Sequence, residues 1–90
     1  MTGAVETAER MRAIAAGLTA AGLTTHLHDT SNALDITATL HRPGRKETEV
    51  VVDEDGYVEI RYWNHAGATP AQVTAVIVRA LAAITAAQRT

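Results

Sequence analysis

Two histidines separated by one residue are the first candidates for chemistry in this chain of 90 residues. His26 and His28 flank Leu27 in a stretch with strand-like alternation, so both imidazoles are expected on one face of a strand. Asp35, on the next expected strand, is placed to reach one of them. Imidazole and carboxylate groups are zinc ligands. His26, His28 and Asp35 are therefore weak candidates for a metal site, or for the polar centre of a ligand-binding domain or small enzyme.

Solvent-facing histidines are the favoured interpretation of the same pattern. A zinc site needs three or four ligands. His41 lies four or more residues along the sheet from His26 in either plausible register, which is roughly 14 Å or more at about 3.4 Å per residue. His65 lies beyond the last expected strand. We therefore expect no metal and no cofactor, with one histidine hydrogen-bonded to Asp35.

Acidic residues are the other reactive groups, and they crowd one segment. They are Glu47, Glu49, Asp53, Glu54, Asp55 and Glu59. A hairpin this charged is usually solvated, whereas acid-base catalysis needs a carboxyl group beside an apolar pocket. The sequence also contains no G-x-S-x-G, phosphate-loop or G-x-G-x-x-G motif. We expect a protein that is not an enzyme and has no catalytic residues.

Composition excludes several further classes. The formal net charge is -2 and the pI about 6.0, so no overall field favours nucleic acid or an anionic membrane. Without cysteine there are no disulfides or thiolate zinc sites. The start MTGAVETAERMRA lacks the basic, apolar pattern of a secretory signal, and no stretch approaches the roughly 20 apolar residues that span a bilayer. The chain is expected to be cytoplasmic, and its richness in Arg and Ala is typical of a GC-rich bacterial genome.

A hairpin over residues 47–63 is the element around which the expected fold is organised. Its alternating residues predict two half-buried strands. A two-residue turn would mix the two faces, whereas a three-residue loop of residues 54–56 places Val52 opposite Val58 and Val50 opposite Ile60. The three-residue loop is therefore predicted.

The same loop makes two further demands on the hairpin. Gly56 is expected in the left-handed conformation that closes such a loop. Glu49 is expected opposite Arg61, as an ion pair on the solvent face.

Two more strands and two helices complete the chain. Strands are expected over residues 23–28 and 34–41, the latter pairing Ala38 with Val50 and Ile36 with Val52. Residues 4–21 have the apolar stripe of a helix. Thr69-Pro70-Ala71-Gln72 has the capping-box pattern that starts a second helix.

These elements predict one α+β domain over residues 1–90. The expected architecture is a two-layer α-β-β-β-β-α sandwich, with a four-stranded antiparallel meander in the order 1-2-3-4 and both helices on one face. The core is expected to be aliphatic, with Tyr62 as its aromatic member, because the chain has no Phe. The element order resembles that of small bacterial secretion-chaperone-like and adaptor domains, and this likeness implies a dimer that binds an extended segment of another protein.

Four residues are expected on the sheet face opposite the helices: Val51, Tyr57, Arg61 and Trp63. Aromatic residues and Arg exposed together are enriched at protein interfaces. Alternatively, Trp63 folds over the loop that follows it and Tyr57 shields the turn.

The fourth strand and the second helix offer two further contact surfaces. The strand has neither Pro nor Lys to prevent pairing with another chain. The helix is nearly apolar all round, which favours packing against the alanines of the first helix, with a subunit contact as the alternative. The expected function is a non-enzymatic, homodimeric interaction module with a possible protein partner; the sheet face, the strand edge and the second helix remain alternative dimer surfaces.

Overall fold

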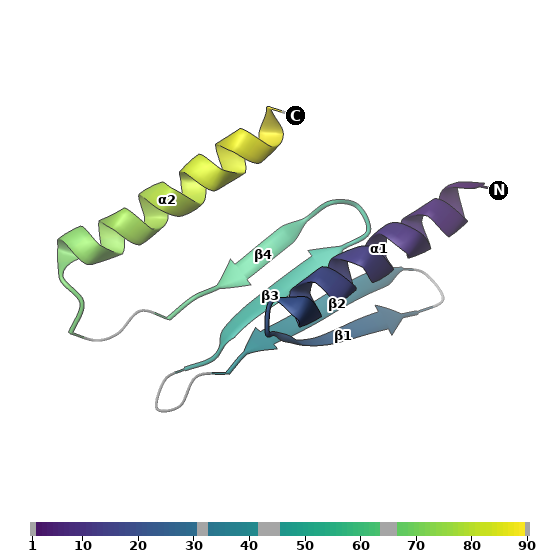
Figure 1. The fold of residues 1–90 in the computed structure, drawn as a ribbon, viewed down its shortest axis with the longest axis horizontal. Helices are drawn as coiled ribbons and strands as arrows, with labels where there is room; N and C mark the ends of the chain where they lie inside the picture. Colours follow the sequence, from purple (N-terminus) through teal and green to yellow (C-terminus); the bar gives the residue numbers. More distant parts are fainter. Residues whose placement is uncertain (1, 31–32, 42–45, 64–66, 90) are drawn as a thin grey trace.

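A computed structural model describes residues 2–30, 33–41, 46–63 and 67–89. Its elements are α1 (Thr2–Ala20), β1 (Thr24–Asp29), β2 (Leu34–Leu40), β3 (Thr48–Asp53), β4 (Val58–Arg61) and α2 (Pro70–Gln88). The strands form one antiparallel sheet in the order β1-β2-β3-β4, with a helix at each end of the sequence (Figure 1). The predicted α+β class and meander are confirmed.

The register of the sheet is the one that the apolar alternation predicts. Ile36 pairs with Val52, which pairs with Val58. One row further along, Val50 lies between its neighbours Ala38 and Ile60. These rows lie on one face of the sheet because side chains two residues apart in a strand point the same way. The meander thus presents a continuous apolar face from β2 to β4.

The turn between β3 and β4 has the predicted three-residue loop. The Asp53 amide donates a hydrogen bond to the Tyr57 carbonyl at 3.0 Å, which leaves residues 54–56 between them. Gly56 has a φ of 98°, in the left-handed region. Asp53 also accepts hydrogen bonds on its carboxylate from the amides of Asp55 and Tyr57, each at 2.9 Å. The loop geometry fixes which residues of β3 and β4 meet.

The core lies where α1 crosses β1 and β2. Its buried apolar residues are Met11, Ile36, Ala38 and Val52. Among the described residues the backbone of α1 lies close to β1 and β2 only, while the Met11 side chain shares a core cluster with Ile36 of β2 and Val52 of β3. In Figure 1, α1 likewise lies over the β1 and β2 side of the sheet. Only half of the apolar face is therefore covered.

The start of α2 is also as predicted. Gln72 donates its backbone N–H to the Thr69 hydroxyl at 3.2 Å, and its side chain accepts a hydrogen bond from the Thr69 amide at 2.8 Å. Pro70 occupies the first turn, where its missing N–H costs nothing. Local sequence thus explains where this helix begins.

The position of α2 differs from the one expected. Within the described part of the chain it packs against no other helix or strand, and it has no buried residue. Figure 1 shows it beyond β4, on the opposite side of the sheet from β1. The radius of gyration of 15.4 Å exceeds the value of about 12 Å for a compact domain of this length. The expected packing of α2 on the alanines of α1 is not found in this single chain.

Tyr62 is a second correction that follows from the position of α2. It was expected to be the aromatic member of the core, but its side chain is 53% exposed. Tyr62 follows the last residue of β4, so it lies beyond the paired rows of the sheet. No described helix lies over that end of the sheet, and the side chain therefore stays in contact with solvent.

Replacing Gly56 by Ala should lower the free energy of unfolding by about 1 to 2 kcal/mol, because a Cβ is strained at positive φ. Gly17→Ala is the matched control. Gly17 lies inside α1 with open space around its Cα, and Ala should stabilise the helix by up to about 1 kcal/mol. Urea unfolding at one protein concentration measures both changes. Equal effects of the two substitutions would contradict the turn geometry.

Candidate interaction surface

His26 and His28 lie on the polar face of the sheet, the face opposite α1. His28 pairs with Asp35 in the register, yet its Nε2 lies 2.8 Å from the hydroxyl of Thr37, the residue two positions along β2. The expected hydrogen bond to Asp35 is thus replaced by one to Thr37. The rings of His26 and His28 have centroids 6.3 Å apart. Across the described residues, no group of three potential metal ligands comes together.

His41 lies apart from the other two histidines. Its Nδ1 is 2.8 Å from the Glu47 carboxylate, in a pair with both side chains largely in solvent. His65, also considered from the sequence, lies outside the described residues. The geometry therefore does not combine His26, His28 and Asp35 into a site for metal or acid-base chemistry.

Along β4 the polar face carries a chain of paired charges. The Tyr57 hydroxyl donates to Glu59 at 3.4 Å, and Arg61 donates to Glu59 at 3.0 Å and to Glu49 at 3.4 Å. The hydrogen bond to Glu59 and the two negative charges raise the pKa of the Arg61 guanidinium. The predicted pairing of Glu49 with Arg61 is confirmed. Arg61 is thus already paired within the chain.

The four residues predicted as an interaction site do not form one cluster. Tyr57 and Trp63 are both exposed, but they flank β4 at its two ends, about 20 Å apart at roughly 3.3 Å per residue. Lys46 places its Nζ 5.9 Å from the centroid of the Trp63 ring, a cation–π contact. Val51 is partly buried between Thr37 and Glu59 on neighbouring strands. The polar face is thus a charged band with an aromatic ring near each end.

The strongest unsatisfied surface is on the other face. Along a single cross-strand row the exposed fraction rises from 0% at Ile36 to 6% at Val52 and 56% at Val58. Ile60, in the next row, is 64% exposed. We call the half-sheet of β3 and β4 the open apolar face: Val58 and Ile60 are exposed on it and Val50 is partly buried, while Val52 forms its covered inner border beside α1. Sequence reasoning identified these residues as buried and so missed them as a site.

The second unsatisfied surface is α2 itself. Its exposed large apolar residues are Val73, Val76, Ile77, Val78, Leu81 and Ile84. With 19 residues and a mean hydropathy of 1.5, this helix has the length and composition of a membrane span, contrary to the expectation that no stretch would qualify. That evidence is weak, since core helices of soluble proteins meet the same criteria. An apolar helix with no buried residue exposes a surface that apolar cover would stabilise.

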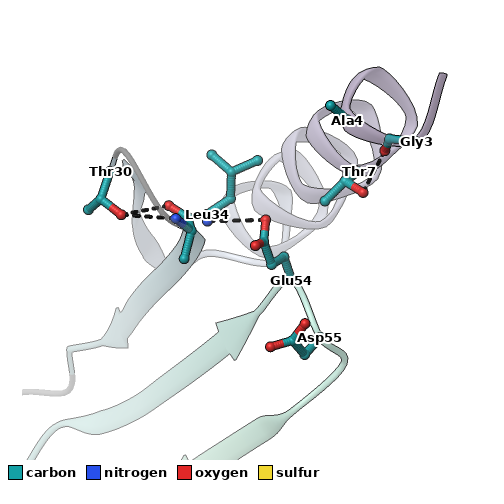
Figure 2. Close-up of a pocket in the computed structure, with 8 residues that line it drawn as sticks. Gly3, Ala4, Thr7, Thr30, Leu34, Glu54 and Asp55 are labelled. Atoms are coloured by element: carbon teal, nitrogen blue, oxygen red, sulfur yellow. Dashed lines mark hydrogen bonds between the residues drawn. The ribbon is translucent and has the colours of Figure 1, made fainter. Parts of the chain in front are cut away.

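A shallow, open groove of about 440 Å³ lies between the start of α1, the β1–β2 connection and the β3–β4 turn. Figure 2 shows Glu54 reaching from the turn toward the backbone of Leu34, whose N–H donates a hydrogen bond to the Glu54 carboxylate at 3.3 Å. Asp55 is the other ionisable residue of the lining. Glu54 is held by the Leu34 amide and Asp55 is exposed, so neither carboxyl group has the apolar surroundings that acid-base catalysis needs. The groove therefore does not favour an enzymatic function.

Comparison of the chain with protein-family models, curated proteins and solved structures found no match.

Protein purified without a histidine tag should contain far less than one metal ion per chain, because His28 is hydrogen-bonded to Thr37 and no three potential ligands come together within the described part of the chain. Elemental analysis measures this, with His26→Ala and His28→Ala as comparison variants. A stoichiometric metal that either substitution removes would contradict the interpretation and favour the metal-binding alternative.

Proposed function

We propose that this protein is a non-enzymatic interaction module that works as a homodimer, in the manner of an adaptor or chaperone-like protein. The observation that carries the proposal is the steep rise in exposure across one apolar row, from buried Ile36 to exposed Val58. The same apolar face is buried in the core at β2 and exposed to solvent at β4. Its exposed half therefore has the residue composition of a protein interior. A second chain can supply the missing cover.

The total surface supports the same proposal. The chain exposes 6939 Å², whereas a compact monomer of 9.5 kDa exposes about 5,000 Å². The excess of about 1,900 Å² per chain corresponds to about 3,800 Å² in a dimer, within the range of obligate homodimers. Much of this excess is apolar, because α2 and the open apolar face contribute to it.

A membrane is a weaker explanation for the apolar helix. Arg79 stands at the middle of α2, where a charge in a bilayer costs roughly 2.5 to 3.5 kcal/mol even on the lower scale. The helix also lacks the Trp and Tyr residues that anchor spans at the interface, and the Lys-rich polar face of surface-bound helices. A dimer leaves Arg79 free to reach water at the rim of the contact.

The polar face is the surface proposed for a second protein. Tyr57 and Trp63 are exposed at the two ends of β4, and Val51 lies on the same face between the charged pairs. An extended segment of about six residues would span the distance between the two rings. Binding of a second protein at the polar face leaves the open apolar face free for the homodimer. One molecule can therefore dimerise and bind its partner at the same time.

Ile60→Lys should weaken homodimerisation at least tenfold, because it places a charge on the open apolar face. Val51→Lys is the matched control: it introduces the same side chain one row away on the polar face, opposite Glu59. Sedimentation velocity over a micromolar concentration series measures both. The wild type and Val51→Lys should be dimers. A monomeric wild type, or a dimer that Ile60→Lys leaves intact, would contradict the proposal.

A further inference from the structure

We infer that the dimer forms by exchange of the second helix, so that α2 of each copy lies on the open apolar face of the other. The inference rests on the proposed homodimer and adds how it is built. It follows from three features of the chain: an uncovered strip of sheet, a helix without cover, and the place of that helix beyond the sheet edge.

The open apolar face has the dimensions of one helix. β3 and β4 are two strands spaced by about 4.8 Å, so the strip they form is about 10 Å wide, which is the diameter of a helix with its side chains. The strip is six residues long in β3, or about 20 Å, and α2 with its 19 residues is about 28 Å long. One helix beside α1 therefore completes the second layer.

The composition of α2 disfavours an isolated helix. Most helical stability in proteins comes from packing of an apolar face, and α2 contains seven β-branched residues, which have a low helix propensity. These are Val73, Thr74, Val76, Ile77, Val78, Ile84 and Thr85. Its apolar residues occur around most of its circumference, so α2 needs cover on more than one side. A sheet below and a second helix beside it meet that need.

A second copy is the cover that the placement of α2 favours. The helix lies past β4, the edge strand of the sheet, where no described element lies beneath it (Figure 1). A two-fold axis beside β4 brings the partner's β4 edge next to it and extends the sheet under α2. By symmetry each copy gives one helix and receives one, and both unsatisfied surfaces disappear in a single closed assembly.

The chain has no cysteine, so one nitroxide can be attached at a chosen site. The label is placed on Arg79→Cys, at the middle of α2, in chains without ¹⁵N. These are mixed with ¹⁵N-labelled wild-type chains, refolded together and observed by NMR. Only contacts between copies broaden the signals. Exchange predicts that the amides of β3 and β4 lose most of their intensity, and regain it when the nitroxide is reduced.

The matched control carries the nitroxide on Glu9→Cys, an exposed position of α1, and should broaden β3 and β4 of the other copy much less. A dimer in which the Arg79→Cys label leaves β3 and β4 unchanged overturns the exchange and keeps the homodimer. In a second mixture the nitroxide-labelled Arg79→Cys chains also carry ¹⁵N and are diluted into an excess of unlabelled wild-type chains. Broadening of β3 and β4 in this mixture, and not in the first, places α2 on its own sheet and also overturns the exchange. A monomer in sedimentation overturns both proposals. A monomer that binds vesicles of phosphatidylcholine and phosphatidylglycerol also overturns both proposals, because the apolar surface of α2 would then contact a bilayer.

Discussion

The width of the apolar sheet face relative to the helix that covers it governs this structure. Four strands form a face about 20 Å across, at about 4.8 Å between strands, and one helix covers about half of that. Met11 reaches β2 and the near side of β3, where Ile36 and Val52 are buried, and the cover ends there. The exposed β4 residues follow from this mismatch, because α2, the second helix of the chain, does not lie over the sheet.

Local physical chemistry made much of the fold predictable from the sequence. The alternation around Val52 and Val58 allowed only one register with a uniform apolar face, and that register required a three-residue loop with Gly56 at positive φ. The start of α2 followed from Thr69 and Gln72, whose hydrogen bonds are local. Each of these features depends on residues close in sequence or directly opposite in a hairpin.

The position of α2 could not be predicted by the same means. Periodicity shows that a helix has an apolar side, but it does not show which surface that side contacts or whether the surface belongs to the same chain. The sequence therefore placed Tyr62 and Ile60 in the core, and the structure leaves both exposed. For the same reason the sequence predicted a dimer without predicting its contact surface, for which three alternatives remained.

The candidate chemistry shows a related limit. His26-x-His28 has a chelating spacing, but the outcome depends on side-chain hydrogen bonds, and His28 contacts Thr37 instead of Asp35. The aromatic residues of the polar face were predicted as exposed, and they are, yet their distance along β4 separates them. Residue types and strand faces were predictable; convergence of side chains was not. The surface with the greatest free-energy cost of exposure is made of aliphatic residues, which carry no motif.

Hydrogen exchange of the α2 amides as a function of protein concentration tests most directly whether this helix depends on a second chain. We expect slow exchange over residues 73–88 in the associated protein and rapid exchange after dilution to monomer. The amides of β2, beneath α1, should remain protected at both concentrations because their cover is within the chain. If α2 stays equally protected in the monomer, its cover lies in its own chain and the account is contradicted.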